Sequence, residues 1–117
     1  VQQMNANSFA DSATGKSMAN AEITNGADIV FQAAGATGLG VIEACQENNV
    51  YAIGVDSDQS SIAPNTVLTS AMKRVDNAVY EAVQELIDGT LEGGVKTFDL
   101  AAEEQRNSFV ASNAFAG

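Results

Sequence analysis

Two short apolar runs in this chain each end in residues that can bind a small molecule. The first, residues 29–31, runs into a glycine-rich turn that contains Gly35. The second, residues 50–55, is followed directly by Asp56, whose carboxylate accepts hydrogen bonds. Buried parallel strands that end in glycines or carboxylates form a polar edge, and open α/β sheets bind ligands at that edge. We therefore expect a small-molecule site at these two strand ends.

The order of the elements that would position this site predicts an α/β fold. Right-handed βαβ units give a parallel sheet with helices on both faces, so we expect a three-layer α/β/α sandwich. The expected helices cover 13–25, 37 to about 48, and 74–88. The expected strands cover 27–33, 50–55 and 67–72, with weaker candidates at 1–5 and 95–100.

Local signals mark the ends of these helices. Asp11 or Ser12 is expected to cap the first helix, and Thr37 the second, because their side-chain oxygens can accept a hydrogen bond from the first turn. Gly89 is expected to end the third helix, which has the clearest helical spacing of apolar residues in the chain. Its stripe consists of Val75, Val79, Ala82, Val83, Leu86 and Ile87.

Composition narrows the range of functions. The chain has 117 residues, which suits one domain, and a net charge of -10 from fifteen acids and five bases. Nucleic-acid binding needs clustered Lys and Arg, and this chain has no such cluster. Binding to anionic membrane surfaces is disfavoured for the same reason. The chain has no histidine and one cysteine, Cys45, so a zinc site or a Ser-His-Asp triad is excluded within it. We interpret Cys45 as a small core residue, and no metal or cofactor is expected.

Several segments together resemble the C-terminal lobe of the basic membrane protein family, the purine-nucleoside receptor lipoproteins of bacterial ABC importers. The resemblance spans residues 8–88. Such receptors look like type I periplasmic binding proteins, in which two α/β lobes close on a ligand, and only one lobe is present here. A second glycine expected after Gly35 is replaced by Ala36. The matching segments are SFAD at 8–11 with GK at 15–16, GADIVFQAAG at 26–35, TGLGVIEA at 37–44, YAIGVDSDQ at 51–59 and VLTSAMKR at 67–74.

The resemblance implies a purine-nucleoside site built by four residues of this lobe. Phe9 would stack on the base, an interaction worth about 1–3 kcal/mol, and Gly35 would let the ligand approach the backbone. Asp56 would hold the 2′ and 3′ hydroxyls of the ribose, and Lys73 would pair with Asp56 and donate to a ribose oxygen. The residues alone leave plainer roles open: Phe9 packed on the first helix, Asp56 as a loop cap or exposed acid, and Lys73 as a surface charge.

The same strand ends are also compatible with other functions. A lobe of the same fold could bind a sugar or a signal molecule, although the absence of Trp disfavours a sugar. A flavodoxin-like receiver domain would use Asp56 and Lys73, but residues 1–7 lack the acidic pair that such a domain needs. An exposed ligand edge on an isolated lobe could also drive self-association. Asp58 and Gln59 are interpreted as residues that set the loop after the second strand.

The resemblance also sets expectations for the whole protein. Residues 1–100 are expected to form the ligand-binding lobe and 101–117 a tail of uncertain structure, with the opposing lobe absent. The chain starts at Val1 and not at Met, so we expect a fragment or lobe of a longer protein. The resemblance implies a binding protein and not an enzyme. It also implies inosine, guanosine or adenosine as ligand, an ABC permease as partner, and an extracytoplasmic lipoprotein anchored at the bacterial membrane.

Overall fold

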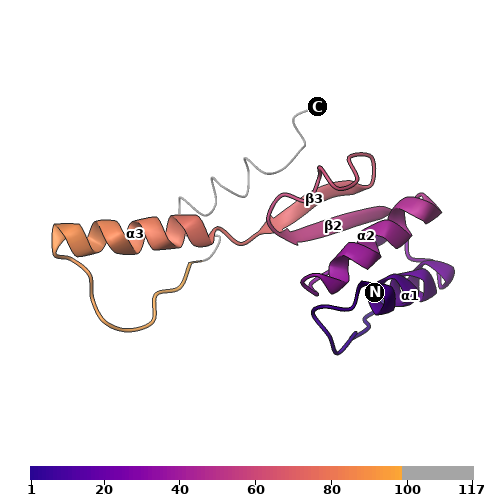
Figure 1. Ribbon diagram of the computed structural model, residues 1–117, viewed down its shortest axis with the longest axis horizontal. Coiled ribbons are helices and arrows are strands. Elements are labelled where there is room, and N and C mark those ends of the chain that lie inside the picture. Colours follow the sequence, from indigo (N-terminus) through magenta and orange to yellow (C-terminus); the bar gives the residue numbers. More distant parts are fainter. Residues whose placement is uncertain (99–117) are drawn as a thin grey trace.

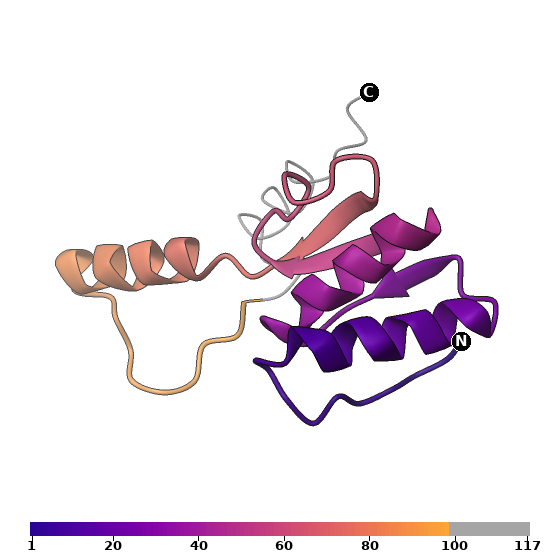
Figure 2. The same cartoon turned by 45° about the vertical axis from the view of Figure 1, so that its right-hand side comes forward.

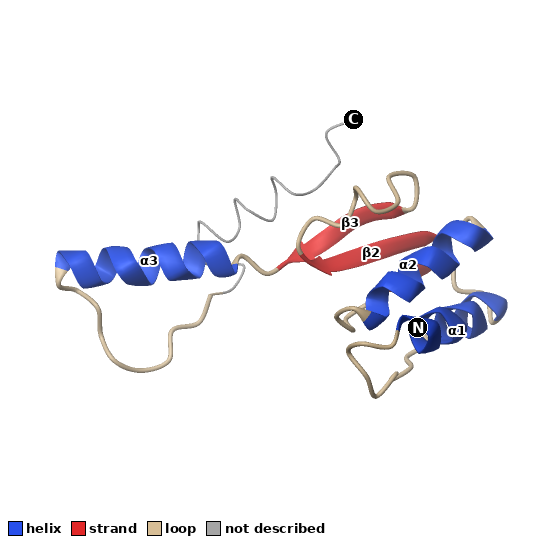
Figure 3. Ribbon diagram, in the orientation of Figure 1, coloured by secondary structure: helices blue, strands red, loops and turns tan. Residues whose placement is uncertain are grey.

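The computed structural model describes residues 1–98, which fold around a three-stranded sheet flanked by helices (Figures 1 and 3). The strands lie in the order β1-β2-β3, and both pairings are parallel. The predicted α/β class with a parallel sheet is therefore confirmed. The elements in chain order are α1 (Ser12–Thr24), β1 (Ile29–Phe31), α2 (Thr37–Asn48), β2 (Tyr51–Asp56), β3 (Val67–Met72) and α3 (Val75–Asp88).

The strands differ in how well the sequence predicts their length. Strand β3 has its predicted bounds, and β2 begins and ends one residue later than predicted. Strand β1 is shorter than predicted because other bonds occupy the residues on both sides of it. The Ala27 N–H donates to the Glu22 carbonyl (3.0 Å), which continues the end of α1, and the Ala34 N–H donates to the Gln32 side chain (3.2 Å).

The hydrophobic core lies between helix α2 and one face of the sheet, and its members are mostly small. Ile42, Ala44 and Cys45 on α2 pack in one buried cluster with Val30 of β1 and Ala52 of β2. Burial raises the pKa of the Cys45 thiol to about 11, so it stays protonated at neutral pH. The interpretation of Cys45 as a core residue is confirmed by its complete burial.

Helix α1 lies along α2 (Figure 2), and glycines allow the two backbones to approach closely. A Cβ atom on Gly40 would lie 1.8 Å from the Ser12 carbonyl oxygen, and one on Gly15 would lie 2.2 Å from the Thr37 carbonyl oxygen. Lys16 adds a polar link, since its ammonium contacts the carboxylates of Glu43 (2.9 Å) and Glu47 (2.8 Å) on α2.

The two predicted helix caps have different outcomes. Asp11 caps α1 as predicted: its Oδ1 accepts a hydrogen bond from the Thr14 N–H at 3.0 Å. The prediction for Thr37 is wrong, because α2 follows Ala36 and has no side-chain cap bond. The Thr37 hydroxyl is already engaged by the loop before α1, as described below.

Both weak strand candidates are absent from the described sheet. Residues 1–5 form no strand, which corrects the prediction, since they have no ladder partner. The Gln2 side chain is instead tied to the end of α1, donating to the Asn25 carbonyl at 3.2 Å. Residues 95–98 are not in a strand either, and the rest of the 95–100 candidate and the 101–117 tail lie outside the described residues.

Helix α3 forms as predicted but extends away from the sheet (Figure 1), and none of its residues is buried. The sheet face opposite α2 is likewise open within residues 1–98, because Ile29, Phe31 and Tyr51 are about half exposed. Helices α1 and α2 therefore form one covering layer, and α3 does not form the other. No helix in this described part is long and apolar enough to cross a membrane.

Candidate functional site

The four predicted site residues all lie at the carboxyl edge of the sheet, where its parallel strands end. Gly35 follows β1, Asp56 is the last residue of β2, and Lys73 comes directly after β3. Phe9 precedes α1, but its loop reaches the same edge through contacts with Gly35. The structure joins these residues in two pairs.

Phe9 and Gly35 form the first pair. Gly35 has φ +55°, a left-handed conformation that favours glycine, and it lies directly against Phe9. A Cβ atom at Gly35 would be 3.2 Å from the Phe9 carbonyl oxygen and 3.7 Å from Cδ1 of its ring. The Phe9 residue is 76% exposed, so its ring is not packed on the first helix. An exposed ring beside bare backbone can offer a flat apolar surface to a ligand.

The loop that carries Phe9 is held in place by Thr37, a role that the sequence analysis missed. The Thr37 hydroxyl donates to the Ser8 carbonyl (3.0 Å) and accepts from the Asp11 N–H (2.9 Å), and the Thr37 N–H donates to the Phe9 carbonyl (3.3 Å). Thr37 is 1% exposed, so these bonds are shielded from water. No local pattern reveals this role, because the partners lie more than 25 residues away in sequence.

Asp56 and Lys73 form the second pair, through their backbones. The Lys73 N–H donates to the Asp56 carbonyl at 2.9 Å, and both side chains are exposed. The predicted ion pair between the Asp56 carboxylate and the Lys73 ammonium is not among the salt bridges of residues 1–98. Asp56 has φ +67°, which Asp and Asn tolerate better than bulkier residues do. Asp56 and Lys73 are thus adjacent through their backbones at the rim, and both side chains are exposed to solvent.

Side-chain amides of Gln32 and Gln59 connect the ends of β1 and β2. Gln59 Oε1 accepts from the Gln32 Nε2 (2.8 Å) and from the Val55 N–H (2.9 Å), while the Gln59 N–H donates to Ser70 Oγ (3.0 Å). Gln32 is 3% exposed and Ser70 is 1% exposed. The interpretation of Gln59 as a loop-setting residue agrees with these bonds, whereas Gln32 and Ser70 were not identified. Gly54 leaves room for these hydrogen bonds, because a Cβ atom at this position would lie only 2.6 Å from Ser70 Oγ.

Asp58 also has a structural role in the loop after β2. Its Oδ1 accepts a hydrogen bond from the Ser60 N–H at 2.9 Å, and that backbone bond lowers the pKa of the Asp58 carboxyl group. This agrees with the interpretation of Asp58 as a residue that sets the loop and leaves Asp56 as the exposed carboxylate nearest the end of β2.

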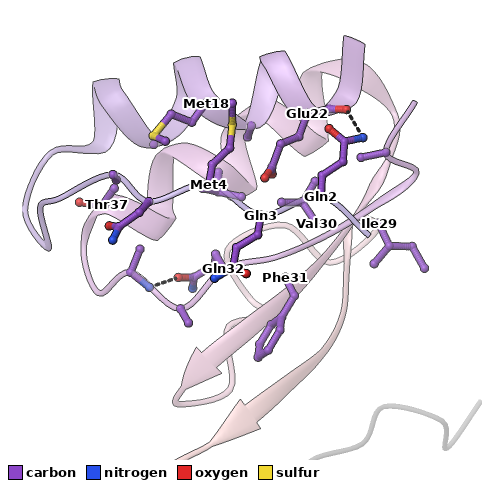
Figure 4. Close-up of a pocket in the computed structure, with 18 of the residues that line it drawn as sticks. Gln2, Gln3, Met4, Met18, Glu22, Ile29, Val30, Phe31, Gln32 and Thr37 are labelled. Atoms are coloured by element: carbon purple, nitrogen blue, oxygen red, sulfur yellow. Dashed lines mark hydrogen bonds between the residues drawn. The ribbon is translucent and has the colours of Figure 1, made fainter. Parts of the chain in front are cut away.

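The edge that carries the two pairs is an open surface. A cavity with a volume of about 1170 Å³ lies beside β1 (Figure 4). Phe9 and Thr37 line it, but Gly35, Asp56 and Lys73 do not.

A comparison with known families defines the class of protein. Residues 1–104 match the family Bmp, described as "ABC transporter substrate-binding protein PnrA-like", and the chain belongs to this family. It is 46% identical to Basic membrane protein D of Borreliella burgdorferi over 99 residues, which are 82% of this chain and 29% of that protein. The resemblance seen in the sequence is thereby confirmed.

The other matches point to the same fold. A solved ABC transporter solute-binding protein from Aeropyrum pernix K1 matches with a TM-score of 0.72 and 31% identity, over 82% of this chain and 27% of that one. The chain is also 45% identical to Transcriptional activator protein med of Bacillus subtilis, over 64% of this chain and 24% of that protein. This chain thus spans less than a third of the length of these relatives.

Proposed function

We propose that this chain is one lobe of an extracytoplasmic receptor that binds purine nucleosides for an ABC importer. Phe9 stacks on the purine base, and Gly35 lets the base approach the backbone. Asp56 accepts hydrogen bonds from the 2′ and 3′ hydroxyls of the ribose, and Lys73 donates to a ribose oxygen. The lobe acts by closing with an opposing lobe around the ligand, and it performs no catalysis.

One observation carries this proposal: an exposed aromatic ring, an exposed carboxylate and an exposed ammonium lie at one sheet edge in a member of a substrate-binding family. The ring matches a flat, apolar base, and the carboxylate matches a pair of neighbouring hydroxyls. The hydrogen-bonded amides of Gln32 and Gln59 link the two strand ends. The absence of Trp, the residue on which sugars most often stack, favours a nucleoside over a free sugar.

The first experiment is a two-dimensional NMR titration of the chain with inosine, guanosine, ribose and a pyrimidine nucleoside. Shifts at Phe9, Gly35, Asp56 and Lys73 with the purine nucleosides only would support the proposal. Shifts with ribose alone would retain the edge as a sugar site and reject stacking by Phe9. If no compound shifts these residues, the titration is repeated with a full-length family member, and a second negative result rejects the nucleoside.

Substitution of Asp56 by Asn tests the ribose contact. Asn has the same shape and tolerates the left-handed backbone, but it lacks the charge that strengthens the hydrogen bonds to the hydroxyls. We expect Asp56→Asn to weaken inosine binding by about tenfold, the effect of losing roughly 1.5 kcal/mol of a charged hydrogen bond. The matched control is Asp28→Asn, an exposed carboxylate that directly precedes β1 at the opposite edge of the sheet. Equal affinities of the two variants for inosine would contradict the proposed role of Asp56.

A further inference from the structure

Strand β1 is an edge strand whose outer backbone groups are free. The Asp28 carbonyl accepts from the Tyr51 N–H of β2 (3.0 Å), and the Gln32 N–H donates to the same strand (3.3 Å), so alternate residues of this segment bond to β2. In a parallel pair the residues between them direct their N–H and C=O groups the other way. The backbone groups of Ile29 and Phe31 therefore point away from β2, and within residues 1–98 they bond to no segment on that side.

Residues 1–6 lie across a cavity from this free edge (Figure 4). The cavity of about 1170 Å³ described above is lined by residues 1–9 and by residues 26–34, which include β1. Within the described part of the chain, the backbone groups of residues 1–6 bond to no other backbone group either. Two stretches of unpaired backbone thus face one space, and a pairing between them would satisfy both.

The segment is held at both ends. Near its start, the Gln2 side chain donates to the carbonyls of Glu22 (3.4 Å) and Asn25 (3.2 Å) at the end of α1. Just beyond its end, the Ser8 carbonyl accepts from the Thr37 hydroxyl (3.0 Å). Pairing with β1 would therefore order only the short backbone between two fixed points, which limits its entropic cost.

The contact between Phe9 and Gly35 sets the register of such a pairing. The two residues lie directly against each other, and the same spacing carried back along both segments places Gln3 opposite Ile29. The chain runs from residues 1–6 through α1 into β1, the strand–helix–strand order that gives two parallel neighbouring strands. The segment therefore fits the edge of β1 in the same direction as the other strands.

The side chains of the segment already alternate as this register requires. Figure 4 shows Gln2 and Met4 pointing toward α1, whereas Gln3 points away from it. The register places Met4 opposite Val30, whose buried side chain belongs to the core beneath the helix layer. Gln3 then shares the open face of the sheet with Ile29, which is about half exposed.

We propose that residues 1–6 are a strap that closes on β1 as a fourth parallel strand and so fixes the loop that follows it. In the closed form the Ile29 N–H donates to the Gln2 carbonyl, and the Met4 N–H donates to the Ile29 carbonyl. Phe31 bonds in the same way, as donor to Met4 and acceptor from Ala6. The strap itself is independent of any ligand, and only its effect on nucleoside binding rests on the proposed function.

A disulfide cross-link tests the register. Directly opposite residues of neighbouring strands lie about 4.7–4.9 Å apart, within the range that a disulfide spans. We expect Asn5→Cys with Phe31→Cys to cross-link on mild oxidation, and Asn5→Cys with Ile29→Cys, displaced by two positions, to do so at least about tenfold more slowly. The native Cys45 is buried and does not compete. Equal rates, or no cross-link in the first pair, would overturn the proposal.

A pair of proline variants tests the hydrogen bonds in the chain without a cross-link. Met4→Pro removes an N–H that the closed strap donates to β1, whereas Gln3→Pro removes one that points away from β1, which edge strands tolerate. Met4→Ala, which keeps the N–H, is the side-chain control. By NMR, the amides of Ile29 and Phe31 should exchange at least about tenfold faster in Met4→Pro than in Gln3→Pro or the wild type. Similar exchange in the two proline variants would contradict the closed strap.

The cross-linked variant also tests the effect of the strap on the site. A strap that is locked closed holds the Phe9 loop before the ligand arrives, so less freedom is lost on binding. We expect the oxidised form of the Asn5→Cys, Phe31→Cys variant to bind inosine at least about threefold more tightly than its reduced form. Equal affinities would overturn the effect of the strap on Phe9. A cross-link that forms in a chain that binds no nucleoside would instead reject the proposed function and support the strap.

Discussion

Thr37 is the residue on which the position of Phe9 depends most directly. Its hydroxyl bridges Ser8 and Asp11 on either side of Phe9. The exposed Phe9 is thus positioned by hydrogen bonds to a polar residue that is distant in the sequence. Gln32 and Gln59 have the same relation to Gly35 and Asp56.

Replacement of Thr37 by Val tests this dependence. Valine keeps the shape of the side chain but removes both hydroxyl bonds, and a partly buried carbonyl and N–H then lose their partner. We expect Thr37→Val to lower the free energy of unfolding by about 1–3 kcal/mol and to broaden the NMR signals of Phe9. The control is Thr24→Val, whose hydroxyl bonds to the Asn20 carbonyl on the exposed end of α1. Similar losses in the two variants, measured by urea denaturation, would argue against a special role for Thr37.

The sequence predicts those residue roles that depend on near neighbours. Asp11 was identified as a cap because its partner, Thr14, is three residues away. The hydroxyl of Thr37 was assigned to the helix that it begins, whereas its partners lie across the fold at Ser8 and Asp11. Gln32 gave no signal for the same reason, since its partner Gln59 is 27 residues away. Residues that support a site through distant contacts are therefore the ones that sequence patterns miss.

At the scale of elements, the contact between α1 and α2 is set by glycine. Gly40 lies inside α2, where Ala is intrinsically favoured by about 1 kcal/mol, yet a Cβ there would overlap the Ser12 carbonyl of α1. We expect Gly40→Ala to lower the free energy of unfolding by about 1–3 kcal/mol because the helices must move apart. Gly93→Ala is the matched control, since nothing lies within 4 Å of its added Cβ. Urea denaturation that shows Gly40→Ala to be as stable as the control would contradict this close packing.

The Asp11 cap of α1 should make the stability of the folded chain depend on pH. Hydrogen bonds from the backbone and side chain of Thr14 lower the pKa of Asp11 in the folded chain. The carboxylate therefore stabilises the fold at neutral pH, and this contribution is lost as the pH falls below about 4 and the group is protonated. In Asp11→Asn the cap bond remains but does not titrate. We expect its stability, measured by denaturation from pH 7 to pH 2, to fall less steeply than that of the wild type, and parallel curves would refute the assignment.

The elements themselves were predicted best where an apolar run ends at clear stop signals. Strand β3 and the end of α3 at Gly89 have their predicted positions, and α2 ends at Asn48 as expected. The predicted strand at β1 was too long, and the predicted strand at residues 1–5 is absent. A strand needs a neighbouring strand as hydrogen-bonding partner, and amino-acid composition does not reveal that partner. The carboxyl edge was predictable because it follows from where the apolar runs stop.

At the scale of the whole molecule, α3 is a helix without a partner. Its apolar stripe is exposed from Val75 to Ile87, and it is the only helix in the described part that has no buried residue. Isolated helices of this length are marginally stable in water. We expect the amides of Val79 and Val83 to exchange almost as fast as those of an unfolded peptide, while the amides of Ile42 and Cys45 in α2 are strongly protected. Comparable protection of both helices would show that something covers α3 in solution.

The bond between Gln32 and Gln59 has a consequence for how the proposed nucleoside site would select its ligand. It joins the end of β1 to the loop after β2 and so restrains the spacing between Gly35 and Asp56. A molecule that touches both residues of the proposed site would have to fit that spacing. Selection would then act on molecular length: compounds whose base and sugar hydroxyls are one bond too far apart, or too close, would bind more weakly even with every functional group intact.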